Sequence, residues 1–181
     1  IYSKGKSSLI DTGGKVAYDA NESSTITKYT TIPLLKSLGI RKLNYLFLTH
    51  GDKDHAGEAI YLEKHFQVDN IYLNLGQQQA LEQNIRKEIP RTKQVGQEAI
   101  FQTGNFTLYQ INKEWKDENT ESSVFYVNHP YLTILLTGDA TIQTEEYLLK
   151  RYHLKVDILK VGHHGSNTST SLSFLKETKP R

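Results

Sequence analysis

The segment Leu43–Thr49 (LNYLFLT), with its continuation His50–Gly57 (HGDKDHAG), decides the fold of this chain. A continuous apolar run of this length is typical of a strand buried on both faces of an α/β sheet. A helical pattern from Pro33 to Gly39 precedes the run, and another from Ala59 to Phe66 follows it. This alternation predicts a single α/β domain over residues 1–181, and a mostly stranded centre gives it α+β character.

Reactive side chains stand where this strand and three other strand-like runs end. The run at 8–11 ends on Asp11, and the runs at 132–138 and 156–162 end before Asp139 and the pair His163-His164. Ligands of α/β sheets gather beyond the carboxyl ends of the strands. We therefore expect these side chains to meet the segment His50–His55 at one edge of the fold.

The residue types in this set favour a metal site. Imidazoles and carboxylates without thiolates suit zinc, manganese or iron, and the chain contains no cysteine. A loop after a strand lets closely spaced ligands converge, whereas the surface of a helix does not. One ion cannot take every candidate, so we expect two divalent metal ions. The expected ligands are His50, Asp52, Asp54, His55, Asp139 and His163.

Other interpretations of these residues remain open. Asp52 and Asp54 also suit the cap of a helix that begins near Ala56. Asp11 suits either a carboxylate that orients a metal-bound histidine or the cap of a turn. His164, next to an expected ligand, is placed to donate a proton to a leaving group.

Composition excludes several classes of protein. The longest apolar runs fall far short of the ~18 residues of a membrane-spanning helix, and no secretory signal opens the chain. The absence of cysteine excludes a disulfide scaffold and a thiolate nucleophile. A net charge of +2 is too small to indicate a nucleic-acid partner. The chain also lacks methionine, and we expect it to be a piece of a longer polypeptide.

The remaining pattern predicts further strands, helices and loops. The turn of a hairpin is expected at Asn128–Pro130. The run Gly165–Thr170 indicates either a phosphate-holding loop or an N-cap loop before a last helix. We expect strands at 68–73, 99–111, 124–127, 131–136 and 156–161, helices at 77–88 and 145–152, and loops at 20–31 and 112–122.

These motifs resemble those of the metallo-β-lactamase superfamily. Asp11 in SLIDTGG resembles the family's first motif aspartate, and His50–His55 is similar to its H-x-[HD]-x-D-H motif. Asp139 and His163 resemble its bridging aspartate and its final histidine. The resemblance implies an αββα sandwich with a dinuclear metal site at one edge.

The sequence departs from the family pattern at the first metal position. The family places a further histidine between its second motif and the bridging aspartate, and the matching stretch Asp117–Val124 contains none. The first ion then keeps only His50, Asp52 and Asp139. Asp52 stands where many members have a histidine, and this harder ligand makes Mn²⁺ as well suited as Zn²⁺.

Within the superfamily, the motifs are similar to those of the C-terminal domain of ComEC-type DNA-uptake channels of competent bacteria. LTHGDKDHAG, LLTGDA and LKVGHHGSNTSTS carry this likeness from about Leu9 to Lys179. Members continue beyond both ends, so we expect truncation at both ends. The likeness implies a soluble domain on the extracytoplasmic side of a bacterial cell-membrane protein. Its expected partner is the parent chain's own transmembrane channel, without membrane insertion of this fragment.

The same resemblance implies a metal-dependent DNA phosphodiesterase, a nuclease that degrades the non-transported strand during natural competence and acts on single-stranded DNA. Asp54 and His164 are its expected catalytic residues, and Lys53, Ser166 and Thr168 are expected to hold phosphate. Two alternatives remain. One is a small-substrate phosphoesterase similar to phosphorylcholine esterases, and the other is a non-catalytic DNA-guiding module with a degenerate metal site.

Overall fold

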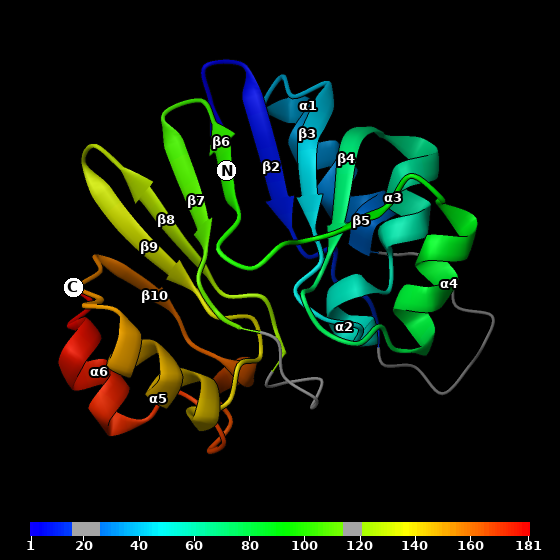
Figure 1. Cartoon of the computed structure of the whole chain (residues 1–181). Helices are drawn as coiled ribbons and strands as arrows, with labels where there is room; N and C mark the ends of the chain where they lie inside the picture. Colours follow the sequence, from blue (N-terminus) through cyan, green and yellow to red (C-terminus); the bar gives the residue numbers. More distant parts are fainter. Residues whose placement is uncertain (16–25, 114–120) are drawn as a thin grey trace.

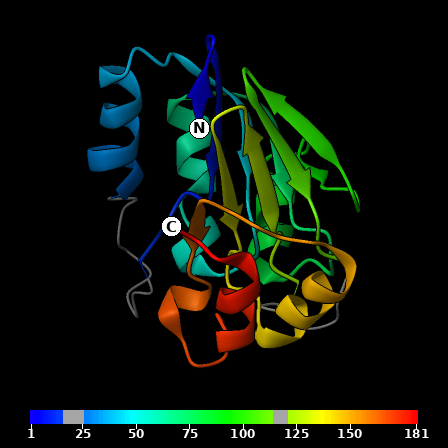
Figure 2. The same ribbon diagram turned by 90° about the vertical axis from the view of Figure 1, so that its left-hand side faces the viewer.

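Two β-sheets lie face to face, and helices cover the outer face of each (Figures 1 and 2). The computed structural model of the chain describes residues 1–15, 26–113 and 121–181. Helices of the N-terminal half lie against the first sheet, and helices of the C-terminal half lie against the second. The expected αββα sandwich is therefore confirmed.

The first sheet is built from the N-terminal half of the chain. Its strands follow sequence order, the first pair antiparallel and every later pair parallel. The apolar run at 43–49 forms its central strand, with Leu46 packed toward the helices and Phe47 toward the second sheet. The strands are β1 (Tyr2–Ser3), β2 (Lys6–Ile10), β3 (Lys42–Phe47), β4 (Gln67–Leu73) and β5 (Lys93–Gln94).

The second sheet contains the predicted hairpin. Its neighbouring strands are also consecutive in sequence. The last two strands along the chain are parallel to each other, and all other pairs are antiparallel. The hairpin turns at Pro130 and Tyr131, because Asn128 and His129, predicted in the turn, still belong to the preceding strand. The strands are β6 (Ile100–Thr103), β7 (Phe106–Gln110), β8 (Phe125–His129), β9 (Leu132–Leu136) and β10 (Ile158–Lys160).

The predicted helices are confirmed with shifted ends. The helix predicted at 77–88 begins at Ala80 rather than Gln77, because the side chains of Gln79 and Glu82 form a capping box there. None of the helices in the described part of the chain has the length and apolar character to cross a bilayer. The helical segments are η1 (Thr27–Thr31), α1 (Ile32–Ser37), α2 (Lys53–Ala56), α3 (Ala59–His65), α4 (Ala80–Glu88), α5 (Ile142–Arg151), η2 (His163–Gly165) and α6 (Leu172–Thr178).

The expectation of a loop at 20–31 is wrong at its C-terminal end, where the π-helical turn η1 leads directly into α1. Residues 16–25 of that range lie outside the described residues. The carboxylate of Glu58 accepts the backbone N–H groups of Ile26 and Thr27, and Thr27 is fully buried. A helix start needs partners for its free N–H groups, and here the partner comes from a distant part of the sequence.

Aromatic side chains fill the space between the sheets. Phe47 lies with its ring centroid 4.7 Å from that of Phe101 and 4.9 Å from that of Phe125. Leu108 and Val127 of the second sheet are fully buried in the same cluster. This contact holds the two sheets together and thereby fixes the distance between their carboxyl-end loops.

The strands that carry the expected ligands end at the same edge of the fold (Figure 1). In the first sheet β2 and β3 are parallel neighbours, with Ile10 opposite Phe47, so Asp11 and the loop after β3 emerge together. In the second sheet β9 and β10 are likewise parallel, with Leu136 opposite Lys160. The loops before Asp139 and before His163 therefore also emerge together.

We predict that Phe47→Ala lowers the free energy of unfolding by about 3–5 kcal/mol, because it removes a buried ring and leaves a cavity between the sheets. Urea denaturation of the metal-free protein measures the change. Tyr131→Ala is the control, since Tyr131 is 89% exposed and its replacement should change the value by less than ~0.5 kcal/mol. Equal effects of the two changes would contradict the assignment of Phe47 to the core.

Candidate metal centre

Asp11 connects the ends of two strands of the first sheet. It follows β2 with a left-handed φ of +59°, and its N–H donates to the carbonyl of Phe47 (2.8 Å). Its carboxylate accepts hydrogen bonds from the N–H and the hydroxyl of Thr49, both at 2.8 Å. The same carboxylate lies 2.7 Å from Nδ1 of His55. One side chain thus fixes the loop that follows β3.

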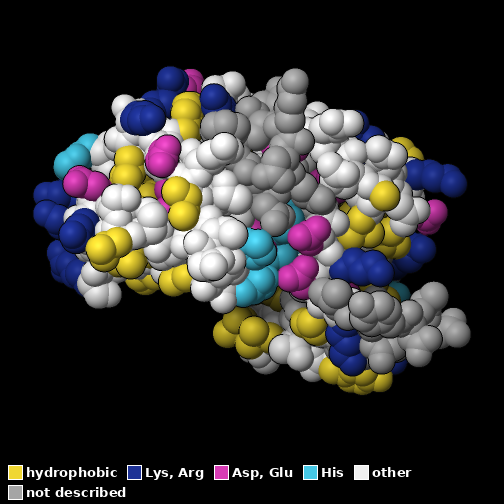
Figure 3. Space-filling view, turned by 90° about the horizontal axis from the view of Figure 1, so that it is seen from below, with side chains coloured by type: hydrophobic (Ala, Val, Ile, Leu, Met, Phe, Trp, Pro, Cys, Tyr) yellow, Lys and Arg dark blue, Asp and Glu magenta, His cyan; other side chains and the backbone are white. Residues whose placement is uncertain are grey.

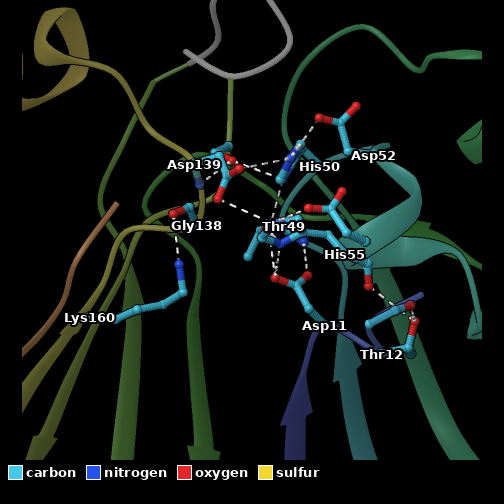
Figure 4. Close-up of polar contacts among 12 residues, drawn as sticks. Asp11, Thr12, Thr49, His50, Asp52, His55, Gly138, Asp139 and Lys160 are labelled. Carbon is cyan, nitrogen blue, oxygen red and sulfur yellow. Dashed lines mark hydrogen bonds and ion pairs between the residues drawn. The ribbon is translucent and has the colours of Figure 1, made fainter. Parts of the chain in front are cut away.

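His50 and His55 leave this loop with their ring centroids 4.2 Å apart. His50 follows Thr49 and is fully buried, and His55 lies in the single helical turn α2. Because an ionised carboxylate only accepts hydrogen bonds, Nδ1 of His55 carries the proton in its contact with Asp11. Nε2 of His55 is left to face Asp139 on the second sheet (Figure 4).

The second sheet contributes Asp139 from the loop after β9. Its carboxylate oxygens lie 3.1 Å from Nε2 of His55 and 3.9 Å from Nε2 of His50. The preceding Gly138 has a left-handed φ of +53°, and its carbonyl accepts a hydrogen bond from Nζ of Lys160 (2.9 Å). Ligand atoms of His50, His55 and Asp139 all lie within 4.8 Å of one another, so the three side chains form a candidate metal-binding group.

A second candidate group shares His55 with the first. Ligand atoms of Asp54, His55 and His164 also lie within 4.8 Å of one another. Nε2 of His164 is 2.9 Å from Oδ2 of Asp54 and 3.3 Å from Nε2 of His55. Because one imidazole nitrogen binds one ion, the two groups describe adjacent positions with His55 at their boundary.

Asp52 lies beside the first group. Its Oδ2 is 3.4 Å from Nε2 of His50, and its side chain is partly exposed. Asp52 occupies the N-cap position of α2, but its side chain makes no capping hydrogen bond there. The capping interpretation of this side chain is therefore wrong, and its carboxylate is directed toward the cluster instead (Figure 4).

The structure brings His164 closer to the cluster than His163. Both residues have a left-handed backbone, with φ of +43° for His163 and +51° for His164. Nε2 of His163 remains 3.9 Å from Oδ2 of Asp139, and its Nδ1 lies 3.1 Å from the hydroxyl of Thr168. The assignment of His163 as a ligand and His164 as a proton donor stays a prediction.

Two of the residues expected to hold phosphate, Ser166 and Thr168, form a chain of contacts that ends on His163. Ser166 and Thr168 have hydroxyl oxygens 3.0 Å apart, and Thr168 continues this chain of contacts to His163. Lys53 is exposed at the first position of α2, between Asp52 and Asp54. Histidine and acidic side chains are exposed together in the middle of the face at this edge (Figure 3). The cluster is therefore accessible from solvent on one side.

Charges inside the cluster shift the pKa values of its members. Burial would lower the pKa of His55, but the carboxylates of Asp11 and Asp139 outweigh it and raise that pKa to about 10. Burial would raise the pKa of Asp139, but His55, His50 and His164 hold it at about 2. Burial, followed by the charge of His55, lowers the pKa of His50. In the metal-free cluster these shifts favour a protonated His55 beside an ionised Asp139, and a bound cation would replace that proton.

The residues present fit a divalent cation. Nε2 of His50 is buried and, within the described residues, makes no hydrogen bond, and Oδ1 of Asp139 is buried with only the ion-pair contact to Nε2 of His55 (3.1 Å). Buried polar atoms without partners are costly, and a cation between them would satisfy both. Imidazole and carboxylate ligands suit Zn²⁺ and Mn²⁺.

Two residues of the site are missing from the sequence prediction. The Thr49 hydroxyl donates to Asp11 and lies 3.1 Å from Nδ1 of His50. The Ser122 hydroxyl lies 3.0 Å from the same Nδ1 and accepts the N–H of Asp139 (3.0 Å). The position of Thr49, directly before the first expected ligand, could have indicated from the sequence that it belongs to the site. Ser122 gives no such signal, because it comes from a polar segment that the sequence assigns to a loop.

The segment that lacks the expected histidine is only partly described. Asp117–Thr120 lie outside the described residues, whereas Glu121, Ser122 and Ser123 are buried. Ser122 makes the contact with His50 from this segment. The described part of this segment therefore supplies the Ser122 hydroxyl beside the ring of His50, where the family pattern has a further histidine.

Comparison with protein families agrees with this architecture. Residues 1–78 match the family model described as the metallo-β-lactamase superfamily. Solved structures show the same fold: a metallo-β-lactamase from Pontibacter korlensis superposes with a TM-score of 0.62 at 18% identity, over 98% of this chain and 82% of that one. The metallo-β-lactamase MIM-1 from Novosphingobium pentaromativorans gives 0.62 at 13% identity, over 99% and 78%.

Curated relatives match nearly the whole chain. ComE operon protein 3 of Bacillus subtilis is 30% identical over 96% of this chain and 24% of its own length. Recombination protein 2 of Haemophilus influenzae is 32% identical over 98% and 22%. Competence protein ComA of Neisseria gonorrhoeae is 32% identical over 82% and 20%. The chain thus spans less than a quarter of the length of these relatives.

We predict that Gly138→Ala destabilises the metal-free protein by roughly 1–3 kcal/mol. A Cβ at Gly138 would lie 2.8 Å from the hydroxyl of Ser122 and 3.1 Å from Cβ of Thr49, and its φ of +53° disfavours a side chain. Urea denaturation measures the loss. Gly96→Ala is the control, because a Cβ there has no neighbour within 4 Å. A loss no larger than that of the control would contradict the close junction at Gly138.

Proposed function

Because this chain is a metallo-β-lactamase-fold domain homologous to a segment of ComE operon protein 3, Recombination protein 2 and Competence protein ComA, we propose that it is a metal-dependent phosphodiesterase that cleaves DNA. The observation that carries the proposal is the meeting of His50, His55 and Asp139 around buried atoms without hydrogen-bond partners. The name of the Neisseria gonorrhoeae relative suggests natural competence as the setting. In that setting the substrate is single-stranded DNA, the strand that is not transported.

Two divalent ions, Zn²⁺ or Mn²⁺, fit the two adjacent candidate positions. When bound, such ions lower the pKa of water toward neutrality and neutralise charge on a phosphate. Asp139 lies between the positions and would contact both ions. The first position would use His50, Asp52 and Asp139, and the second would use Asp54, His55, Asp139 and a histidine of the His163-His164 pair.

The chain's own polar residues would bind and orient the phosphodiester at the exposed side of the cluster. Lys53 supplies a positive charge, and Ser166 and Thr168 supply hydroxyls that donate to phosphate oxygens. His164 is exposed and held 2.9 Å from Asp54, so its ring is positioned where it can give a proton to the leaving oxygen. A proton donor on this side makes departure of the alkoxide easier.

The setting of the domain follows from its relatives and is part of the proposal. Each of the three relatives is at least four times as long as the matched segment. We propose that the remainder of the parent chain forms a transmembrane channel and that this domain works on the extracytoplasmic side. The net charge of +2 provides little attraction for DNA, so binding would depend on the metal ions and on the parent chain.

We predict that Asp54→Asn lowers Mn²⁺-dependent cleavage of single-stranded DNA to the level measured with excess chelator, because it removes a carboxylate from the second metal position. Gel analysis of a labelled oligonucleotide measures the rate. Asp69→Asn is the matched control: Asp69 is exposed to a similar extent, 28% against 32%, but its carboxylate contacts Lys42 away from the cluster. This control should keep the rate of the unmodified protein.

The same assay separates the alternatives. Cleavage that persists unchanged in Asp54→Asn would contradict the assignment of the site. Intact DNA together with cleavage of a phosphorylcholine ester would favour the small-substrate phosphoesterase. DNA binding without cleavage of either substrate, with and without added metal, would favour the non-catalytic guiding module.

We further predict that metal binds in two steps of unequal strength. The second position offers four ligands and the first only three, because no histidine of the segment Glu121–Val124 completes it. Titration of the metal-free protein with Mn²⁺ by calorimetry should resolve one tight and one weaker equivalent, at least about tenfold apart. A single step with two equal equivalents would contradict the difference between the positions.

A further inference from the structure

The hydroxyl of Ser122 makes two contacts that join the two halves of the metal centre. Its hydroxyl oxygen accepts the backbone N–H of Asp139 (3.0 Å) and lies 3.0 Å from Nδ1 of His50. A Cβ on Gly138 would lie 2.8 Å from the same oxygen. Ser122 is fully buried, so these contacts do not compete with water.

The hydroxyl can set which nitrogen of His50 carries the proton. An imidazole that binds a metal ion through Nε2 must be neutral with its proton on Nδ1, and an acceptor at Nδ1 favours that form. The hydroxyl proton of Thr49 is already donated to Asp11, so its oxygen can act as an acceptor. Ser122 offers a second oxygen at a similar distance, 3.0 Å against 3.1 Å for Thr49.

The backbone around Ser122 holds its hydroxyl in place. The carbonyl of Ser122 accepts a hydrogen bond from the side chain of Asn112 (2.9 Å). The next N–H, that of Ser123, donates to the carbonyl of Thr49 (2.8 Å), which directly precedes His50. The side chain of Asn112 also accepts the N–H of Val124 (2.9 Å). The carbonyl of Ser122 is therefore held by Asn112, and the next N–H is held by the loop that carries His50.

We propose that Ser122 is a positioning residue of the first metal position, which holds His50 in its Nδ1-protonated form and Asp139 in reach of the same ion. The inference rests on the proposed metal centre. The inference gives a role to the segment Asp117–Val124, in which the family pattern places a metal-binding histidine. Ser122 does not touch the ion in this role and acts only through His50 and Asp139.

Ser123 provides a matched control. It is the neighbouring residue, it is equally buried, and its hydroxyl has no hydrogen-bond partner within the described residues. Ser122→Ala and Ser123→Ala thus remove the same atom from adjacent buried positions, one in contact with the cluster and one not. Urea denaturation of both metal-free variants shows that each is folded before metal is added.

We expect Ser122→Ala to weaken binding of Mn²⁺ at the weaker equivalent by about 10–100-fold, the usual effect of removing a partner behind a ligand. Ser123→Ala should leave it within about twofold. Nitrogen-15 NMR of the histidine rings in the metal-free proteins gives a second readout. Ser122→Ala should reduce the fraction of His50 protonated on Nδ1, and Ser123→Ala should not.

The outcomes separate this inference from the proposed function. If the unmodified protein binds no Mn²⁺, the metal centre itself is wrong. If it binds Mn²⁺ and both alanine variants bind it equally well, with unchanged His50 signals, the role of Ser122 is wrong. Selective loss in Ser122→Ala supports the inference.

Discussion

The carboxylate of Asp11 is the constraint on which the rest of the site depends. It accepts three hydrogen bonds, two from Thr49 and one from Nδ1 of His55. These bonds fix the loop after β3, choose the tautomer of His55 and direct Nε2 of His55 toward Asp139. Asp11 has a left-handed backbone, and its carboxylate contacts that loop through Thr49. The metal-free cluster brings several charged side chains close together. Without a cation between them, these side chains would repel or pair with one another, and the bonds to Asp11 hold the loop in place against this.

The second constraint is the junction between the sheets. The packing of Phe47 against Phe101 and Phe125 sets the distance between the two carboxyl-end loops. At the edge itself Gly138 allows the backbone of Asp139 to approach Ser122 and Thr49 more closely than a side chain would permit. Histidines from the first sheet and the aspartate from the second then meet at ligand distances. The metal centre is thus a property of the sandwich rather than of either sheet.

Much of this arrangement could be predicted from local sequence. The apolar run ending at Thr49 defines β3, and the rule that ligands gather at the carboxyl ends of strands brings Asp11, His50 and Asp139 together. Other features depend on contacts between distant residues. The turn η1 needs the carboxylate of Glu58, and the two-residue strands β1 and β5 are too short to leave a periodic pattern. Which residue of the His163-His164 pair approaches the cluster depends on backbone angles that the sequence does not reveal.

The most direct measurement is anomalous diffraction from crystals of this protein grown with Mn²⁺. The account predicts an anomalous peak at the first position, within bonding distance of Nε2 of His50 and of the carboxylates of Asp52 and Asp139. A second peak is predicted on the side of Asp54. The account would be contradicted by crystals grown with Mn²⁺ that show no anomalous peak at the cluster, or that show manganese only elsewhere on the surface.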